Sequence, residues 1–275
     1  MDIISANKPA VVRKLEKPIF VVGCCNSGTT ILWRSLLSHP DFSGPTTEGQ
    51  DLKALPRCMK HFLGKQTFRM FAHPRFGKAY RLTEKDYQKA VAERLAAVYA
   101  EHCGECRRFI EKSPANSVRM RFLQTIFSDA SFIIVVRNGM AVSEGIRRKR
   151  WRDPDRQHMA GLRTTIAEAA EQWLHTNRIL MEDRSYLKRS IVIKYEDLVA
   201  DTPKVLRSVL DFCECHSTNF SIPEFETDHN AKQIARLTAK EKETVSNIAG
   251  DLLTVLGYCH RKMTSKQFSE EKSLV

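Results

Sequence analysis

Two glycines and three small hydroxyl residues near the amino end have the types and spacing of a phosphate-binding loop. In VVGCCNSGTT, Gly23 and Gly28 stand at the G-x-x-x-x-G spacing of ATP-binding P-loops, after an apolar run and before a helical pattern. Backbone N–H groups of such a turn and of the helix start attract an anion, and Ser27, Thr29 and Thr30 add hydroxyl donors. The alternative interpretation is a helix N-cap that binds no ligand.

The loop departs from the ATP-binding pattern where that pattern has a lysine. Thr29 follows Gly28 directly, at the position whose lysine reaches the β- and γ-phosphates of a nucleotide triphosphate. Neutral donors suit a ligand with a single 5′-phosphate joined to a less charged group, as in an activated sulfate. The loop therefore favours a phosphate ester other than a triphosphate with its Mg²⁺.

A second anion site is predicted where the apolar run SFIIVV ends. The guanidinium of Arg137 at this strand end is costly to bury unless it meets an anion or a carboxylate. A neighbouring glutamate would satisfy it without a ligand, so both interpretations stay open. The basic run RRKRWR at 147–152 could contact nucleic acid, but a solvated helix face is the commoner explanation and no nucleic-acid motif accompanies it. We therefore expect no nucleic-acid partner.

The composition is that of an ordinary globular protein with a basic surplus. The chain has 275 residues, 44 of them Lys or Arg and 32 Asp or Glu, and its net charge of +12 favours an anionic partner. No apolar run has the length of a signal peptide or a membrane span, so we expect a soluble, cytoplasmic protein. The eight cysteines and nine histidines have no compact zinc spacing, so we expect reduced thiols and no metal.

Alternating apolar runs and helical patterns predict the elements that position these residues. We expect strands buried on both faces at 18–22, 108–112, 131–136 and 190–195. Thr83 and Thr202 are expected to cap two of the helical patterns, which span 30–39, 83–103, 116–127, 164–184, 202–213 and 238–258. Residues 41–80 have no strong pattern and are expected to form a long loop or lid.

This alternation predicts an α/β fold with a central parallel sheet and helices on both of its faces. Right-handed crossovers then bring the loops that follow the strands to one edge of the sheet, where a ligand binds. We expect an N-terminal extension at 1–16, a single domain at 17–260 and a flexible tail at 261–275.

The first loop resembles that of the sulfotransferases that use 3′-phosphoadenosine 5′-phosphosulfate (PAPS). FVVGCCNSGTTILWRSLLSHPDF is similar to the tyrosylprotein and carbohydrate branch, whose pattern is roughly G-x-P-R-S-G-T-T followed by a helix and H-P. The resemblance covers residues 17–258 and implies a three-layer α/β/α, P-loop NTPase-like fold with PAPS as the sulfuryl donor. It implies that the 5′-phosphosulfate binds Gly23, Asn26, Ser27, Gly28, Thr29 and Thr30. Asn26 stands where the family has a basic residue, and Cys25 where it has a proline.

The same resemblance assigns the 3′-phosphate of the donor to the second anion site. The segment that begins at Arg137 is similar to the R-[DN]-G/P element that binds this phosphate. The family usually has a serine eight residues later, where this chain has Gly145, and Ser143 lies two residues earlier. Lys149 stands where a relative carries a further cation for the 3′-phosphate. Tyr195 in IKYEDLV matches a tyrosine near the nucleotide, or is a packing aromatic.

The resemblance also implies which side chains carry out the chemistry. Glu48 lies near the position of the catalytic glutamate of tyrosylprotein sulfotransferases and is the expected base, with Asp51 as the alternative. Lys112 in EKSPAN matches an [ED]-K-[TS]-P element whose lysine lies near the sulfuryl group or the acceptor. It could supply the positive charge that Asn26 lacks. Glu48 and Lys112 could instead simply be exposed to solvent.

Three functions remain open on the sequence. The first is a sulfotransferase that moves a sulfuryl group from PAPS to a hydroxyl of a small molecule, a carbohydrate or a peptide tyrosine. The second is a P-loop kinase or nucleotide hydrolase with a displaced lysine. The third is a catalytically inactive PAPS-binding module, for which Asn26 is the main argument. A homodimer is possible in each case.

Overall fold

The chain forms a central sheet in which all strands are parallel. The computed structural model describes residues 15–60, 70–75, 80–104, 108–148, 164–215 and 229–259. Within these ranges the sheet has five strands in the order β2-β3-β1-β4-β5. They are β1 (Ile19–Gly23), β2 (Phe42–Ser43), β3 (Arg108–Lys112), β4 (Ser131–Val136) and β5 (Ser190–Lys194). Because β1 lies between β3 and β4, the strand order reverses there, and in open α/β sheets ligands bind beside the carboxyl ends of the strands at such a point.

The four strands predicted from the sequence are confirmed to within one residue at each end. Strands β1, β3 and β4 are buried along their whole length, as expected for strands covered on both faces. Strand β5 lies at the edge of the sheet, and Ile193 alone among its residues is buried, so the expectation of burial on both faces is wrong there. The two-residue strand β2 was not predicted because it is too short to show a pattern.

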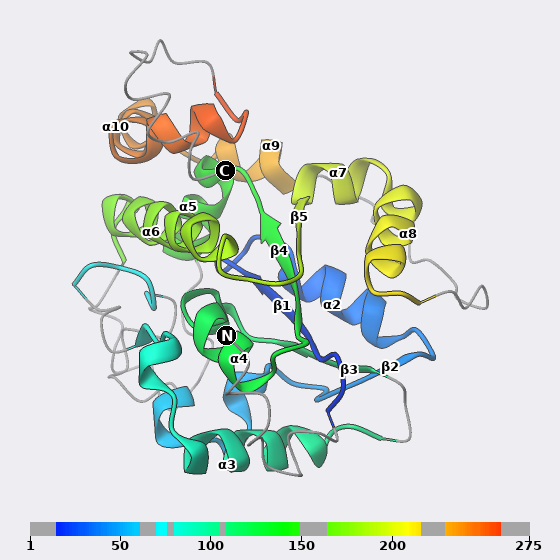
Figure 1. Ribbon diagram of the computed structural model, residues 1–275. Helices are drawn as coiled ribbons and strands as arrows, with labels where there is room; N and C mark the ends of the chain where they lie inside the picture. The colour runs from blue at the N-terminus through cyan, green and yellow to red at the C-terminus, as the bar shows by residue number, and fades with distance from the viewer. Residues whose placement is uncertain are drawn as a thin grey trace.

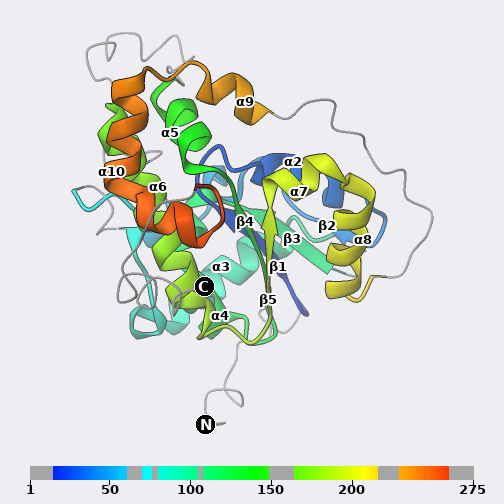
Figure 2. The same ribbon diagram turned by 90° about the horizontal axis from the view of Figure 1, so that it is seen from above.

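Helices cover both faces of the sheet and complete a three-layer α/β/α arrangement (Figures 1 and 2). One face packs against α2 (Thr29–Leu37) and α8 (Thr202–Phe212). The other packs against α3 (Lys89–Ala100), α4 (Met120–Ile126) and α6 (Ile166–Arg184). The remaining helices in the described part of the chain are α5 (Gly139–Arg148), α7 (Tyr195–Ala200), α9 (His229–Ile234) and α10 (Ala239–Val255). The predicted fold class is confirmed.

Two predicted helix starts are wrong, and local hydrogen bonds explain both. Thr83 and Asp86 form a reciprocal capping box, but it closes the single 3-10 turn η4 (Glu84–Asp86), and extended backbone separates this turn from α3. At α8 the cap is Asp201, whose carboxylate accepts from the backbone N–H of Lys204 at 3.0 Å. Thr202 instead donates to the carbonyl of Leu198.

The segment 41–80, expected to be a loop or lid, contains short regular elements in its described part. Strand β2 joins the sheet beside β3, and two 3-10 turns follow, η1 (Gly49–Asp51) and η2 (Arg57–Met59). A further 3-10 turn, η5 (Pro114–Val118), follows β3. No helix in the described ranges combines the length and the apolar character that crossing a bilayer requires.

Candidate donor and catalytic site

The predicted phosphate loop lies between the end of β1 and the start of α2, at the carboxyl edge of the sheet. The backbone of Gly23 exchanges hydrogen bonds with the Ser117 hydroxyl, which anchors the turn to η5. Gly28 has a φ of +93°, and a Cβ there would lie 2.5 Å from Cδ2 of Tyr195. Any other residue would therefore combine an unfavourable backbone conformation with a collision. The strand–turn–helix context that the sequence predicted is confirmed.

Polar atoms of this loop are buried without a partner among the described residues. The Ser27 hydroxyl and the Nδ2 amide of Asn26 are two such atoms. Thr29 is also buried, and as the first residue of α2 its N–H has no acceptor within the helix. A buried donor that lacks an acceptor costs about 1–3 kcal/mol, and an anion at the helix start would relieve this cost. The loop is therefore suited to a phosphate or sulfate group.

Lys112 joins the catalytic candidates to this loop. It is the last residue of β3, its side chain is 1% exposed, and its ammonium lies 5.6 Å from the ring centroid of Trp33. The ammonium donates to the Thr30 hydroxyl at 2.9 Å and forms an ion pair with the Glu48 carboxylate. Glu48 is itself 29% exposed, so it can meet a ligand from solvent. The structure thus brings Glu48, Lys112 and Thr30 together and removes the alternative of a solvent-exposed lysine.

Two further carboxyl groups lie close to this ion pair. Burial and the neighbouring Glu48 raise the pKa of Asp51, and Lys112 lowers it in part. Glu111, which the sequence reasoning did not select, is fully buried, and desolvation raises its pKa to about 7. It accepts hydrogen bonds from Ser113 and Asn116. A charged residue inside the buried strand RFIEK was the signal that could have revealed Glu111.

The turn that carries Glu48 is tied to β3 through the same group of residues. The Ser113 hydroxyl accepts from the backbone N–H of Gln50 at 2.8 Å. The Gln50 amide donates to Glu48 at 2.5 Å, and a Cβ on Gly49 would lie 2.0 Å from the Glu111 carboxylate. Turn η1 therefore packs directly on Glu111, which makes Glu111 part of the support for Glu48.

Arg137 lies just beyond β4 and is 5% exposed. Its guanidinium donates to the Asn26 carbonyl at 2.7 Å and to the side-chain oxygens of Asn230 and Gln233 on α9. Its carbon lies 4.0 Å from the ring centroid of Tyr195, the same ring that covers Gly28. Tyr195 therefore links the two predicted anion sites.

The other predicted residues of the second site lie on α5 or beyond it. Ser143 is fully buried, and its hydroxyl has no partner among the described residues. The hydroxyl of Tyr195 is likewise buried and unpartnered. Lys149 lies outside the described residues. Asn230 and Gln233 were not predicted, because the sequence offers no pattern that places α9 beside α5; Figure 2 shows the two helices together.

No group of three or more His, Cys, Asp or Glu residues within the described ranges is arranged to bind a metal.

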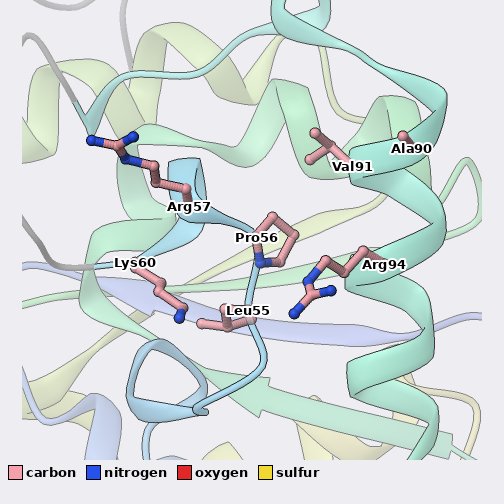
Figure 3. Close-up of a pocket in the computed structure, with 7 residues that line it drawn as sticks. All are labelled: Leu55, Pro56, Arg57, Lys60, Ala90, Val91 and Arg94. Atoms are coloured by element: carbon pink, nitrogen blue, oxygen red, sulfur yellow. The ribbon is translucent and has the colours of Figure 1, made fainter.

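A separate open pocket of about 820 Å³ lies between η2 and α3 (Figure 3). It has basic and apolar walls and is lined by Leu55, Pro56, Arg57, Lys60, Ala90, Val91 and Arg94. The pocket shares no residue with the donor site.

Comparison with known proteins finds protein-tyrosine sulfotransferases that are similar in sequence to this chain. A protein-tyrosine sulfotransferase of Drosophila melanogaster is 23% identical over 272 residues, which cover 87% of this chain and 51% of that protein. Protein-tyrosine sulfotransferase 1 of Rattus norvegicus is 26% identical over 140 residues, 50% of this chain and 36% of that protein. The chain thus spans about half or less of the length of these relatives.

Solved structures share the fold at low sequence identity. Sulfotransferase STF9 from Mycobacterium avium has a TM-score of 0.53 and 17% identity, over 92% of this chain and 80% of that one. The sulfotransferase domain from the curacin biosynthetic pathway has a TM-score of 0.50 and 19% identity, over 94% and 97% of the two chains. The family model described as "Sulfotransferase family" matches residues 18–219, which is most of the chain. This chain therefore belongs to the sulfotransferase family.

Proposed function

We propose that this protein is an enzyme that transfers the sulfuryl group of PAPS to a hydroxyl of an acceptor. The observation that carries the proposal is the contact of Lys112 with both Glu48 and Thr30, beside the unpartnered donors of the first loop. A general base, a cation and an anion cradle thus lie within one group of residues. Membership of the sulfotransferase family supports the class of reaction.

The two anion sites fit the two ends of such a donor. In this proposal the 5′-phosphosulfate binds the first loop, where Ser27 and the Asn26 amide offer buried donors without partners. The 3′-phosphate binds at Arg137, with the buried Ser143 hydroxyl as a second donor. PAPS, when bound, supplies the sulfuryl group and leaves as the 3′,5′-bisphosphate. Tyr195 lies between the two sites and contacts both.

The chain's own residues then divide the chemistry between them. Glu48 accepts the proton of the acceptor hydroxyl, which leaves that oxygen as the nucleophile toward sulfur. Lys112 and Thr30, with Thr29, donate to the phosphate oxygen on which negative charge develops as its bond to sulfur breaks. Lys112 thereby supplies the charge that the family has at the position of Asn26. The reaction is analogous to phosphoryl transfer.

For the acceptor we propose a peptide tyrosine as the first class to test, because the Drosophila and rat relatives are named for that substrate. Carbohydrate and small phenolic hydroxyls are the alternatives. A cytoplasmic location, a homodimer and a single domain at 17–260 stay predictions.

Titration calorimetry with the 3′,5′-bisphosphate of adenosine, compared with ATP plus Mg²⁺, tests the donor site. We expect micromolar binding of the bisphosphate and much weaker binding of ATP. A preference for ATP with Mg²⁺ would support a kinase or nucleotide hydrolase instead. Absence of bisphosphate binding at millimolar concentration would exclude the proposal.

A catalytically inactive PAPS-binding module is the second candidate, and Asn26 favours it. Asn26 has a φ of +67°, a left-handed conformation that asparagine adopts readily, and it carries no charge where the family has a basic residue. Transfer of radiolabelled sulfate to a panel of tyrosine peptides, oligosaccharides and phenols separates the two candidates. Bisphosphate binding without turnover on any acceptor would favour the inactive module.

A further inference from the structure

The space beside Gly145 on α5 is filled by an amide from α9. A Cβ built on Gly145 would lie 2.7 Å from Nε2 of Gln233 and 3.3 Å from Cγ of Asn26. Contacts below 3.0 Å are essentially absent between real Cβ atoms and their neighbours. The residue at this position must therefore be glycine for the Gln233 amide to stay where it is.

The orientation of the Gln233 amide follows from its partner. A guanidinium has donors and no acceptor, so the oxygen of Gln233 faces Arg137, to which it is hydrogen-bonded. The NH₂ end of the same amide must then point away from Arg137, toward Gly145 and Asn26. Gln233 is 8% exposed, so most of its side chain is covered by the surrounding residues.

The neighbouring amide of Asn230 is committed to other partners. Its oxygen accepts from Nε of Arg137 at 2.8 Å, and its nitrogen donates to Glu196 at 2.6 Å. Glu196 also accepts from the backbone N–H of Asn138 and from the hydroxyl of Tyr258. Asn230 therefore fixes the position of α9, whereas the NH₂ group of Gln233 has no such partner among the described residues.

The Gln233 amide on α9 thus lies directly against Arg137, the guanidinium of the second anion site, with its NH₂ end beside Gly145. We propose that Gln233 donates to the 3′-phosphate of the nucleotide and is a specificity-determining residue for that phosphate. It does so from the space that the family's serine side chain would occupy at position 145. This inference rests on the proposed function, because it takes the ligand at Arg137 to be a 3′-phosphate.

Nucleotides with and without the 3′-phosphate test the inference by binding alone, so no acceptor is needed. The probes are the 3′,5′-bisphosphate of adenosine and adenosine 5′-monophosphate, titrated by calorimetry. For Gln233→Ala we expect bisphosphate affinity to fall about 10- to 100-fold, as for a hydrogen bond to a charged group. Affinity for the monophosphate should change less than about 2-fold. Gln88→Ala, the same change at an exposed site before α3, is the matched control and should alter neither affinity.

Two further variants distinguish a hydrogen bond from Gln233 to the phosphate from a purely structural effect of the Gln233→Ala change. Gly145→Ser alone should weaken bisphosphate binding, because the new side chain collides with the Gln233 amide. In combination with Gln233→Ala the serine has room, and we expect it to restore most of the bisphosphate affinity. Such rescue is not expected if Gln233 only supports the fold.

The outcomes separate this inference from the proposed function. If wild-type protein binds no bisphosphate, the proposed function fails. If it binds but Gln233→Ala weakens both nucleotides equally, or neither, the assignment of Gln233 is overturned while the proposed function stands.

Discussion

At the scale of single residues, the site depends on charges that are buried in fixed partnerships. Lys112 is the clearest case, because a buried ammonium needs a carboxylate or another acceptor close by, and here it has Glu48 and Thr30. Its position at the end of β3 is what makes it available to both. The same strand carries Glu111, whose carboxyl lies one residue earlier and faces Ser113 and Asn116 instead.

Replacing Lys112 by methionine should abolish most of the turnover. The methionine keeps the apolar volume over Trp33 but removes the charge that stabilises the departing phosphate, so we expect sulfate transfer to fall about 100-fold or more. The measurement is radiolabelled sulfate transfer to the acceptor found in the panel. Lys85→Met, at an exposed position, is the control. If turnover stays within about 2-fold of the wild-type value, Lys112 does not take part in catalysis.

Replacing Glu111 by glutamine should change how stability depends on pH. The folded-state pKa of about 7 lies above the ordinary value of 4.5, so between these values the folded protein binds the proton more tightly. Wild-type stability should therefore fall as pH rises from about 5 to about 8, by something on the order of 3 kcal/mol from this group. Glutamine cannot ionise and removes this fall.

Urea unfolding of both proteins at several pH values measures the difference, in which the other titrating groups cancel. Glu182→Gln, at an exposed position on α6, is the control. A constant difference between wild type and Glu111→Gln across this range would mean that Glu111 ionises in the folded protein as it does in the unfolded chain.

At the scale of elements, the first loop, the start of α2 and the Tyr195 ring pack against one another. The Tyr195 ring at the start of α7 lies against both Gly28 and Arg137. The loop after β1 and the segment after β5 are thus built as one unit. Glu48 belongs to a second such unit, in which η1 packs on β3 through Gln50 and Ser113.

Gly28→Ala tests the first of these units. The added methyl group meets Tyr195 in a backbone conformation that alanine disfavours, so we expect a loss of stability of roughly 1–3 kcal/mol and loss of bisphosphate binding. Gly104→Ala is a close control, because nothing lies within 4 Å of its added Cβ. Thermal unfolding and calorimetry on both variants provide the test. Wild-type binding by Gly28→Ala would show that the cradle is not the nucleotide site.

At the scale of the whole molecule, the sheet order brings distant segments to one edge. Glu196 connects the end of β4, helix α9 and Tyr258 beyond α10, so the carboxyl-terminal part of the described chain is tied to the second anion site. Burial and the nearby Glu196 carboxylate raise the pKa of Tyr258, so its hydroxyl stays protonated and donates to Glu196. The second anion site is therefore assembled from segments that are far apart in sequence.

The sequence by itself determined four of the strands, six of the helices and the first loop. A parallel strand buried on both faces appears in the sequence as an apolar run, so β1, β3 and β4 could be predicted from neighbouring residues alone. The turn with Gly23 and Gly28 could be predicted in the same way, because few other structures place glycines at this spacing between a strand and a helix. The start of α3 could not be predicted, because the Thr83 capping box closes only a single 3-10 turn. The helical pattern of apolar residues does not show that this turn ends before α3 begins. Strand β2 was too short to leave a signal.

Only the tertiary structure decided what the side chains meet. Whether Lys112 is exposed or paired, and whether Arg137 meets a carboxylate or amides, depends on which segments cross the same sheet edge. Gln233 and Asn230 are 96 and 93 residues from Arg137, and no local periodicity encodes contacts at that separation. Local propensity sets helices and strands, whereas long-range packing sets charges and their partners, and this is why the contact of Gln233 with Arg137 was visible only in the folded chain.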